Sequence, residues 1–198
     1  MSTAAFMTDP DLLRSLEGQQ YLVLRPDRAV ADFYEREQAA LVRRSGGRLP
    51  HPDTGHVTLR GFFEPDRVDL VRDTLAAWAA AQPPIDLQVD AVDGFPPPFK
   101  VVIARLARTT SLVRAYAGLT AAVERAGLDR IGELPIDDWV FHLSLLYGGS
   151  LDDDEWEALH RDTRRDLDVG PSERITAVDF VWYRDGVEHC ERIPLGGG

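Results

Sequence analysis

Two similar four-residue segments recur in this chain and constrain its fold more than any other feature. They read His-Val-Thr-Leu at residues 56–59 and His-Leu-Ser-Leu at residues 142–145. Each lies in a run of aliphatic, aromatic and β-branched residues, which is typical of a β-strand. Because the same histidine-bearing strand occurs once in each half of the chain, we predict a duplicated fold.

The residues around these segments predict a repeated order of strands and helices. Clusters of proline, glycine and aspartate separate runs of alternating or helical hydrophobic spacing. The predicted strands are residues 21–25, 55–62, 85–91, 100–106, 139–147, 175–183 and 189–194. Helices are predicted after Pro26, after Pro65, after a cap at Thr109 or Thr110, and after a cap at Ser150. This order indicates an α+β duplication and not a Rossmann-type alternation.

The length of 198 residues suits one domain, and no low-complexity linker divides the sequence. Residues 1–19 read as a short N-terminal lead-in with some helical character, to which we assign no role. Residues 20–198 are predicted to form a single two-lobed domain.

Strand alternation places the polar residues of the two segments together. Side chains two positions apart in a strand lie on the same face of the sheet. His56 and Thr58 therefore share a face, as do His142 and Ser144, while the residues between them face an apolar side. Arg60 continues the first alternation and is predicted on the face of His56. Polar groups at these positions indicate a cleft.

The residue types suit phosphodiester chemistry. An imidazole titrates near neutral pH, so one histidine can act as a base while another acts as an acid. Breaking a phosphodiester bond needs both, because the nucleophile loses a proton and the leaving oxygen gains one. Hydroxyl groups beside the histidines can donate hydrogen bonds to phosphate oxygens, and this chemistry requires no metal.

The paired segments, extended to residues 56–62 and 142–148, make the chain resemble the 2H phosphoesterase superfamily. The nearest branch is that of the bacterial 2′-5′ RNA ligase-like proteins and cyclic phosphodiesterases, and the resemblance covers residues 20 to 195. It implies an α+β fold of two pseudo-symmetric lobes, whose antiparallel sheets form a concave groove with helices packed outside.

The resemblance also implies residue roles. His56 and His142 would be catalytic, and Thr58 and Ser144 would bind phosphate, with serine replacing the more usual threonine in the second segment. The implied substrates are 2′,3′-cyclic phosphates, ADP-ribose cyclic phosphate, 2′-5′-linked oligonucleotides, RNA 3′ ends and cyclic dinucleotides. The segments do not choose among these substrates, between hydrolysis and ligation, or between acid and base for each histidine.

Further substrate contacts are open to two interpretations. Aromatic residues that follow a histidine strand or lie in the proline-rich loop could stack on a base or simply pack; these are Phe62, Tyr147, Phe95 and Phe99. Arg60 and Lys100 could contact phosphate, or Lys100 could be a charge at a strand edge.

The remaining histidines and the single cysteine carry less information. His51, in a loop beside the first segment, could flank the groove or be a plain surface residue, and His160 and His189 are interpreted as structural or solvated residues. Cys190 is alone, so an intramolecular disulfide and a cysteine-based zinc cage are excluded. We expect no metal and no cofactor; a zinc ion held by the two segment histidines is a minor alternative, because no third ligand is suggested.

The net charge of −11 predicts an acidic surface that repels duplex DNA, although a small anion can bind in a locally basic cleft. No run of 18 apolar residues and no secretory signal pattern occurs, so we expect a cytoplasmic protein that acts as a monomer, with no membrane partner. The expected partner is a small nucleotide or an RNA-terminal phosphate.

These observations predict a metal-independent phosphodiesterase that acts on a 2′,3′-cyclic or 2′-5′ bond through two histidines. Two rival hypotheses stay open. One is a non-catalytic nucleotide- or RNA-binding module that keeps the groove, and the other is a metal-dependent hydrolase.

Overall fold

The computed structural model describes residues 5–132 and 134–196, which form five helices and ten strands. The helices are α1 (Pro10–Ser15), α2 (Ala29–Arg44), α3 (Val68–Ala81), α4 (Thr110–Ala126) and α5 (Asp153–Thr163). The strands are β1 (Gln19–Leu24), β2 (Val57–Phe63), β3 (Ile85–Phe95), β4 (Val101–Leu106), β5 (Arg130–Ile131), β6 (His142–Tyr147), β7 (Arg165–Asp166), β8 (Ser172–Ile175), β9 (Ala177–Arg184) and β10 (Val187–Pro194).

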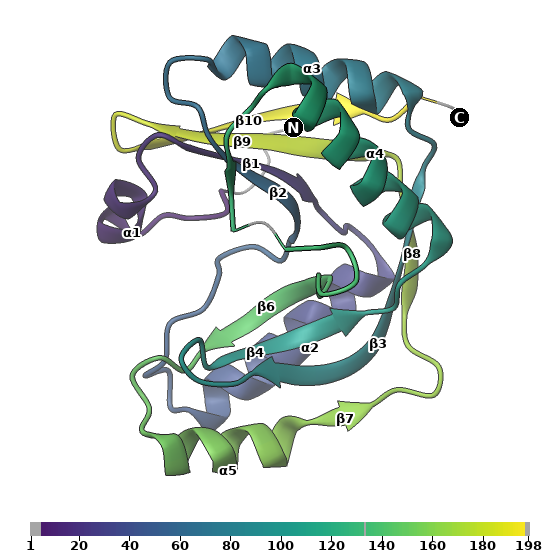
Figure 1. Cartoon of the computed structure of the whole chain (residues 1–198). Helices are drawn as coiled ribbons and strands as arrows, with labels where there is room; N and C mark the ends of the chain where they lie inside the picture. The colour runs from purple at the N-terminus through teal and green to yellow at the C-terminus, as the bar shows by residue number, and fades with distance from the viewer. Residues whose placement is uncertain (1–4, 133, 197–198) are drawn as a thin grey trace.

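The strands form two antiparallel halves that meet at the two histidine strands. The order is β10-β9-β1-β2-β6-β4-β3-β7, with β5 paired to β2 and β8 paired to β3. We call the β10-β9-β1-β2 half lobe 1 and the β6-β4-β3-β7 half lobe 2. One residue pair, Val57 with Leu143, joins them. Figure 1 shows lobe 1 in the upper half of the view and lobe 2 in the lower half. The predicted α+β fold with two lobes is confirmed.

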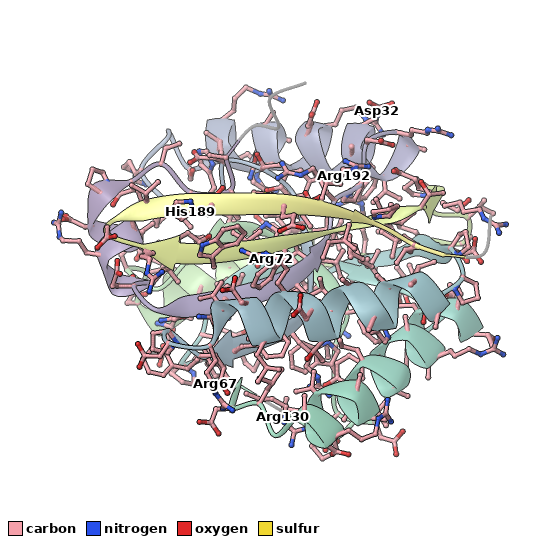
Figure 2. All side chains as sticks on the ribbon, turned by 90° about the horizontal axis from the view of Figure 1, so that it is seen from above. Asp32, Arg67, Arg72, Arg130, His189 and Arg192 are labelled. Atoms are coloured by element: carbon pink, nitrogen blue, oxygen red, sulfur yellow. The ribbon has the colours of Figure 1, made fainter. Side chains whose placement is uncertain are left out.

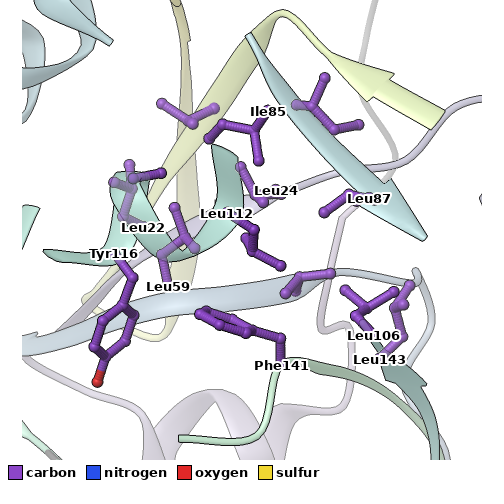
Figure 3. Packing of buried hydrophobic residues seen from close by; sticks show 14 of the residues in the cluster. Leu22, Leu24, Leu59, Ile85, Leu87, Leu106, Leu112, Tyr116, Phe141 and Leu143 are labelled. Carbon is purple, nitrogen blue, oxygen red and sulfur yellow. The ribbon is translucent and has the colours of Figure 1, made fainter. Parts of the chain in front are cut away.

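Helices cover the outer face of each lobe. Helix α3 packs on β9 and β10 of lobe 1, whereas α2 packs on β6 of lobe 2, and α4 lies against α3 and β3 (Figure 1). The side chains between helices and sheet form one hydrophobic core that spans both lobes. Figure 3 shows Leu22 and Leu59 from lobe 1 in the same cluster as Phe141 and Leu143 from lobe 2. Among the described residues, no helix combines the length and apolar character needed to cross a membrane.

Several predicted boundaries differ from the observed ones. The cap at Ser150 is wrong: α5 begins after Asp152, whose carboxylate accepts the Glu155 N–H at 2.8 Å while the Glu155 carboxylate accepts the Asp152 N–H. The predicted strand 175–183 is two strands, because the chain leaves lobe 2 after β8 and enters lobe 1 at β9. The two-residue strands β5 and β7 have no sequence signal that predicts them.

Both histidine strands carry a β-bulge directly after their hydroxyl residue. In β2, Thr58 and Arg60 oppose successive residues of β1, so Leu59 is the extra residue. In β6, Ser144 and Leu146 oppose successive residues of β4 in the same way. A bulge interrupts the alternation of faces, so side chains beyond it exchange sides. The two strands therefore share an irregularity as well as a sequence pattern.

Candidate active site

The histidines and hydroxyls meet where the two lobes join. Antiparallel pairing of Val57 with Leu143 places His56 opposite Ser144, and Thr58 opposite His142. The paired residues Val57 and Leu143 are fully buried in the core, whereas the four polar side chains are partly exposed on the other face. We call this other face of the sheet the groove face. The alternation predicted for the four residues is therefore confirmed by the structure.

Each histidine ring is fixed by the same backbone contact. Nδ1 of His56 lies 3.0 Å from the carbonyl oxygen of Thr54, and Nδ1 of His142 lies 2.8 Å from that of Val140. A carbonyl oxygen can only accept, so Nδ1 of each ring donates its proton. The neutral form of each ring therefore carries its lone pair on Nε2, where it can take up a proton.

An aromatic ring also packs edge-on against each histidine. Phe6 lies against His56 with ring centroids 4.9 Å apart, and Phe95 lies against His142 at 4.8 Å. Phe95 was among the aromatic candidates of the sequence, but Phe6 was not, because it lies in the N-terminal lead-in. No sequence signal connects Phe6 with the histidine strands.

The surroundings favour the neutral form of both histidines. Burial lowers the pKa of His56, the Thr54 carbonyl raises it, and the positive charges of His142 and Arg25 lower it further. Burial also lowers the pKa of His142, against the opposing effect of the Val140 carbonyl. The mutual repulsion of two charged rings disfavours double protonation. A state with one neutral and one protonated histidine is the form that acid–base chemistry requires.

Beyond each bulge, a tyrosine ring lies at or beside the next groove-face position. In β6 this is Tyr147, which interacts with Ser144, and burial raises the pKa of its hydroxyl. In β2 the equivalent position is Gly61, where an added Cβ would lie 3.0 Å from the Tyr21 ring. Tyr147 thus lies on the face of Ser144, and Tyr21 of β1 occupies the matching place in lobe 1. Tyr21 was not predicted, because it belongs to a different strand.

The placement predicted for Arg60 is wrong, because the bulge at Leu59 turns Arg60 to the core side. Arg60 is 2% exposed, donates to the Tyr116 hydroxyl at 2.6 Å and to Thr120, and lies with its guanidinium over the Tyr116 ring. Phe62, two positions further, is fully buried in the same core. Neither side chain has access to the groove face.

Lys100 is also not placed at the histidines. Its Nζ donates to the carbonyl oxygen of Leu151 at 2.7 Å and pairs with Asp153 at 2.8 Å, so it fastens the loop before α5. It lies before β4, at the end opposite the Arg105–His142 pair. Lys100 therefore makes structural contacts at the start of a strand, which agrees with the second of its two interpretations, a charge at a strand edge.

The other histidines occupy structural or surface positions. Nε2 of His160 lies 3.1 Å from the Asp93 carboxylate, and its ring stacks on Trp156. His189 stacks on Trp182 on the outer side of lobe 1, near Arg72 of α3 (Figure 2). His51 is exposed in its loop. Across residues 5–132 and 134–196, no group of three or more His, Cys, Asp or Glu side chains is placed to hold a metal ion.

A pocket opens beside the second histidine. It has a volume of about 280 Å³, and its surface is mostly apolar. Its walls include His142 and Ser144 together with Phe95, Phe99, Val101, Leu134, Asp138, Trp139 and Val140. Phe95 and Phe99, both predicted as stacking candidates, lie here, and Phe99 is 69% exposed. The pocket offers flat apolar surfaces next to an imidazole and a hydroxyl.

Two α+β lobes with a His-x-Thr and a His-x-Ser strand at their junction define a phosphoesterase of the 2H type. The chain belongs to the 2′-5′ RNA ligase superfamily, whose family model matches residues 26–187. The members of this family process phosphoester bonds, and the chain is an enzyme of this class. No curated protein matches it in sequence.

Solved structures with the same fold are distant in sequence. The TT0787 protein of Thermus thermophilus is 19% identical, with a TM-score of 0.68 over 90% of this chain and 98% of that chain. LigT of E. coli complexed with 3′-AMP is 17% identical, with a TM-score of 0.58 over 91% and 99%. Usb1 of Kluyveromyces marxianus is 10% identical, with a TM-score of 0.53 over 91% and 100%. These likenesses show the fold.

Proposed function

We propose that this protein is a metal-independent phosphodiesterase that acts on a small nucleotide with a 2′,3′-cyclic or 2′-5′ phosphodiester bond. The observation that carries the proposal is that the rings of His56 and His142 make the same hydrogen bond. Both rings donate through Nδ1 to a backbone carbonyl, which leaves Nε2 of each for proton transfer. Each ring also lies opposite a hydroxyl of the other lobe.

The reaction follows from this geometry. One neutral histidine removes a proton from water, or from a ribose hydroxyl in the ligase direction, as the nucleophile attacks phosphorus. The other, protonated histidine gives its proton to the leaving 2′- or 3′-oxygen as the bond to phosphorus breaks. Thr58 and Ser144 donate hydrogen bonds to the non-bridging oxygens, where negative charge increases in the transition state.

The pocket beside His142 is the proposed site for the nucleobase. Phe95, Phe99 and Trp139 supply aromatic surfaces on which a base can stack. The LigT structures complexed with 3′-AMP, ATP and NADP+ are those of a distant relative that binds nucleotides. A stacked base here would place the ribose phosphate next to His142 and Ser144.

A substrate panel tests the proposal. Hydrolysis of 2′,3′-cyclic mononucleotides, ADP-ribose cyclic phosphate, 2′-5′ oligoadenylate and cyclic dinucleotides is measured with EDTA present. We expect turnover of at least one substrate, and losses of about 10²–10⁴-fold in His56→Asn and in His142→Asn. His51→Asn, which changes an exposed histidine, is the matched control and should retain full activity.

Two other outcomes would each indicate a different class of protein. Activity abolished by EDTA and restored by a divalent metal would indicate a metal-dependent hydrolase. Nucleotide binding without turnover, unaffected by His56→Asn, would indicate a binding module.

A further inference from the structure

The N-terminal segment, residues 5–18, lies on the groove face of lobe 1. Phe6 is 2% exposed and packs with Val23 of β1 and with Val181 and Tyr183 of β9. Val181 is paired with Tyr21, so these side chains share the face of Tyr21 and Gly61. The segment, which includes α1, therefore covers the face that carries His56 and not the outer face.

Hydrogen bonds fasten this segment to both margins of the lobe. The Glu188 carboxylate of β10 accepts the N–H groups of Phe6 and Met7, each at 2.9 Å. On the other side, the Thr54 hydroxyl donates to the Ala5 carbonyl oxygen at 2.8 Å. Thr54 also holds the ring of His56 through its own carbonyl. The segment is thus tied directly to the residue that orients His56.

Phe6 lies between two charged or chargeable groups. Its ring lies beneath the Arg25 guanidinium at 3.7 Å, and it makes a T-shaped contact with the His56 ring, with the ring centroids 4.9 Å apart. Arg25 in turn donates to Asp179 at 2.7 Å. Phe6 therefore occupies space beside the His56 ring.

The two lobes differ in what covers the groove face. In lobe 2 the aromatic partner of His142, Phe95, borders an open pocket of about 280 Å³. In lobe 1 the aromatic partner of His56 is supplied by the N-terminal segment and is buried. The space beside His142 is thus an open pocket, whereas Phe6 occupies space beside His56.

We propose that the N-terminal segment restricts the enzyme to substrates with one nucleoside, and that Phe6 is a positioning residue for His56. The inference rests on the proposed function. In-line displacement places the nucleophile and the leaving oxygen on opposite sides of phosphorus. A 2′-5′ dinucleotide needs room for a nucleoside on both sides. A 2′,3′-cyclic mononucleotide needs room for a nucleoside on one side and for water on the other. With its groove face covered by the N-terminal segment, lobe 1 leaves room for water but not for a second nucleoside.

The first test compares two adenosine phosphodiesters that differ in the number of nucleosides, 2′,3′-cyclic AMP and 2′-5′-linked ApA. We expect the wild-type chain to prefer the cyclic nucleotide in kcat/KM. Phe6→Ala and Glu188→Ala, which loosen the segment at two places, should both reduce this preference by about tenfold or more. Leu12→Ala, a change at an exposed residue of the same segment outside the Phe6 cluster, is the matched control and should keep the wild-type ratio.

The second test measures the effect of Phe6 on the pKa of the His56 ring. The pKa values of His56 and His142 are followed by NMR of their ring nitrogens. In Phe6→Ala the pKa of His56 should rise, because water reaches the ring, while that of His142 stays unchanged; Phe6→Leu should restore most of the difference. Equal shifts in both histidines, or none, would overturn the positioning role.

The outcomes separate the inference from the function on which it rests. If the wild-type chain turns over neither of these substrates nor any other member of the panel, the proposed function fails. If it turns over cyclic AMP and ApA with a ratio that Phe6→Ala and Glu188→Ala leave unchanged, the function stands and the restriction by the N-terminal segment is wrong.

Discussion

At the scale of single residues, the candidate site depends on how each imidazole is held. His56 and His142 have the same backbone contact two positions upstream and the same edge-on phenylalanine. The two phenylalanines come from unrelated parts of the chain, Phe6 before β1 and Phe95 at the end of β3. The sequence pattern shows the histidines and hydroxyls, whereas the groups that fix them are brought together only by folding.

The hydroxyl pair gives a prediction at this scale. Thr58→Val and Ser144→Ala remove a hydrogen-bond donor with little change of shape. Each should lower kcat by about 10²-fold, as the loss of one transition-state donor does. The urea midpoint should remain near that of the wild-type chain. Thr74→Val, which alters a partly exposed threonine of α3, serves as the control. An unchanged kcat in both variants would remove the proposed phosphate contacts.

Gly55 gives a second residue-scale prediction. A Cβ at this position would lie 2.7 Å from the ring of buried Tyr34, whose hydroxyl accepts a hydrogen bond from Gln38. Gly55→Ala should therefore destabilise the fold by about 1–3 kcal/mol and displace the neighbouring His56. Gly149→Ala is the control, since no atom lies within 4 Å of its added Cβ. Thermal unfolding and kcat/KM check both effects, and equal melting temperatures would contradict the account.

At the scale of elements, the two bulges decide which side chains reach the groove. They move Tyr147 onto the face of Ser144 and move Arg60 away from that of Thr58. Neither bulge was predictable, because Leu59-Arg60 and Leu145-Leu146 contain no glycine or other residue that marks one. The sequence therefore correctly predicts both strands and the faces of the first three residues of each motif. It does not predict the faces of the residues after the bulge, because the register there depends on the neighbouring strand.

The displaced arginine gives the element-scale prediction. Arg60 is buried and donates to Tyr116 of α4, so it ties β2 to this helix. Arg60→Met fills a similar volume but leaves the Tyr116 hydroxyl without this donor. Unfolding in urea should show a loss of about 1.5–3 kcal/mol, with KM for the cyclic nucleotide unchanged. A raised KM at unchanged stability would show instead that Arg60 contacts substrate.

At the scale of the whole molecule, each lobe contributes one histidine and one hydroxyl to the candidate site. The lobes share one core and meet at Val57 and Leu143, so each histidine lies opposite a hydroxyl of the other lobe. The duplication in the sequence predicts this arrangement. It does not predict the asymmetry, because the N-terminal segment has no repeat in the second half, and its packing on lobe 1 depends on long-range contacts with Glu188 and Thr54.

The two histidines also link stability to pH. Folding lowers the pKa of both rings below the value of about 6.5 expected in the unfolded chain, so the unfolded chain binds more protons below neutral pH. Their contribution is fully present above about pH 6.5 and is lost as pH falls through the lowered values. In urea unfolding at about pH 7.5 and about pH 5.5, the double variant His56→Gln/His142→Gln should lose less stability than the wild-type chain. Equal losses would contradict the lowered pKa values.

The pH–rate profile tests the central claim most directly. For the best substrate of the panel, kcat/KM of the wild-type chain should follow a bell-shaped curve with one ascending and one descending limb. His56→Asn should lose one limb and His142→Asn the other, each at a strongly reduced rate. If both variants kept both limbs, or if either kept the wild-type rate, His56 and His142 would not be the paired acid and base.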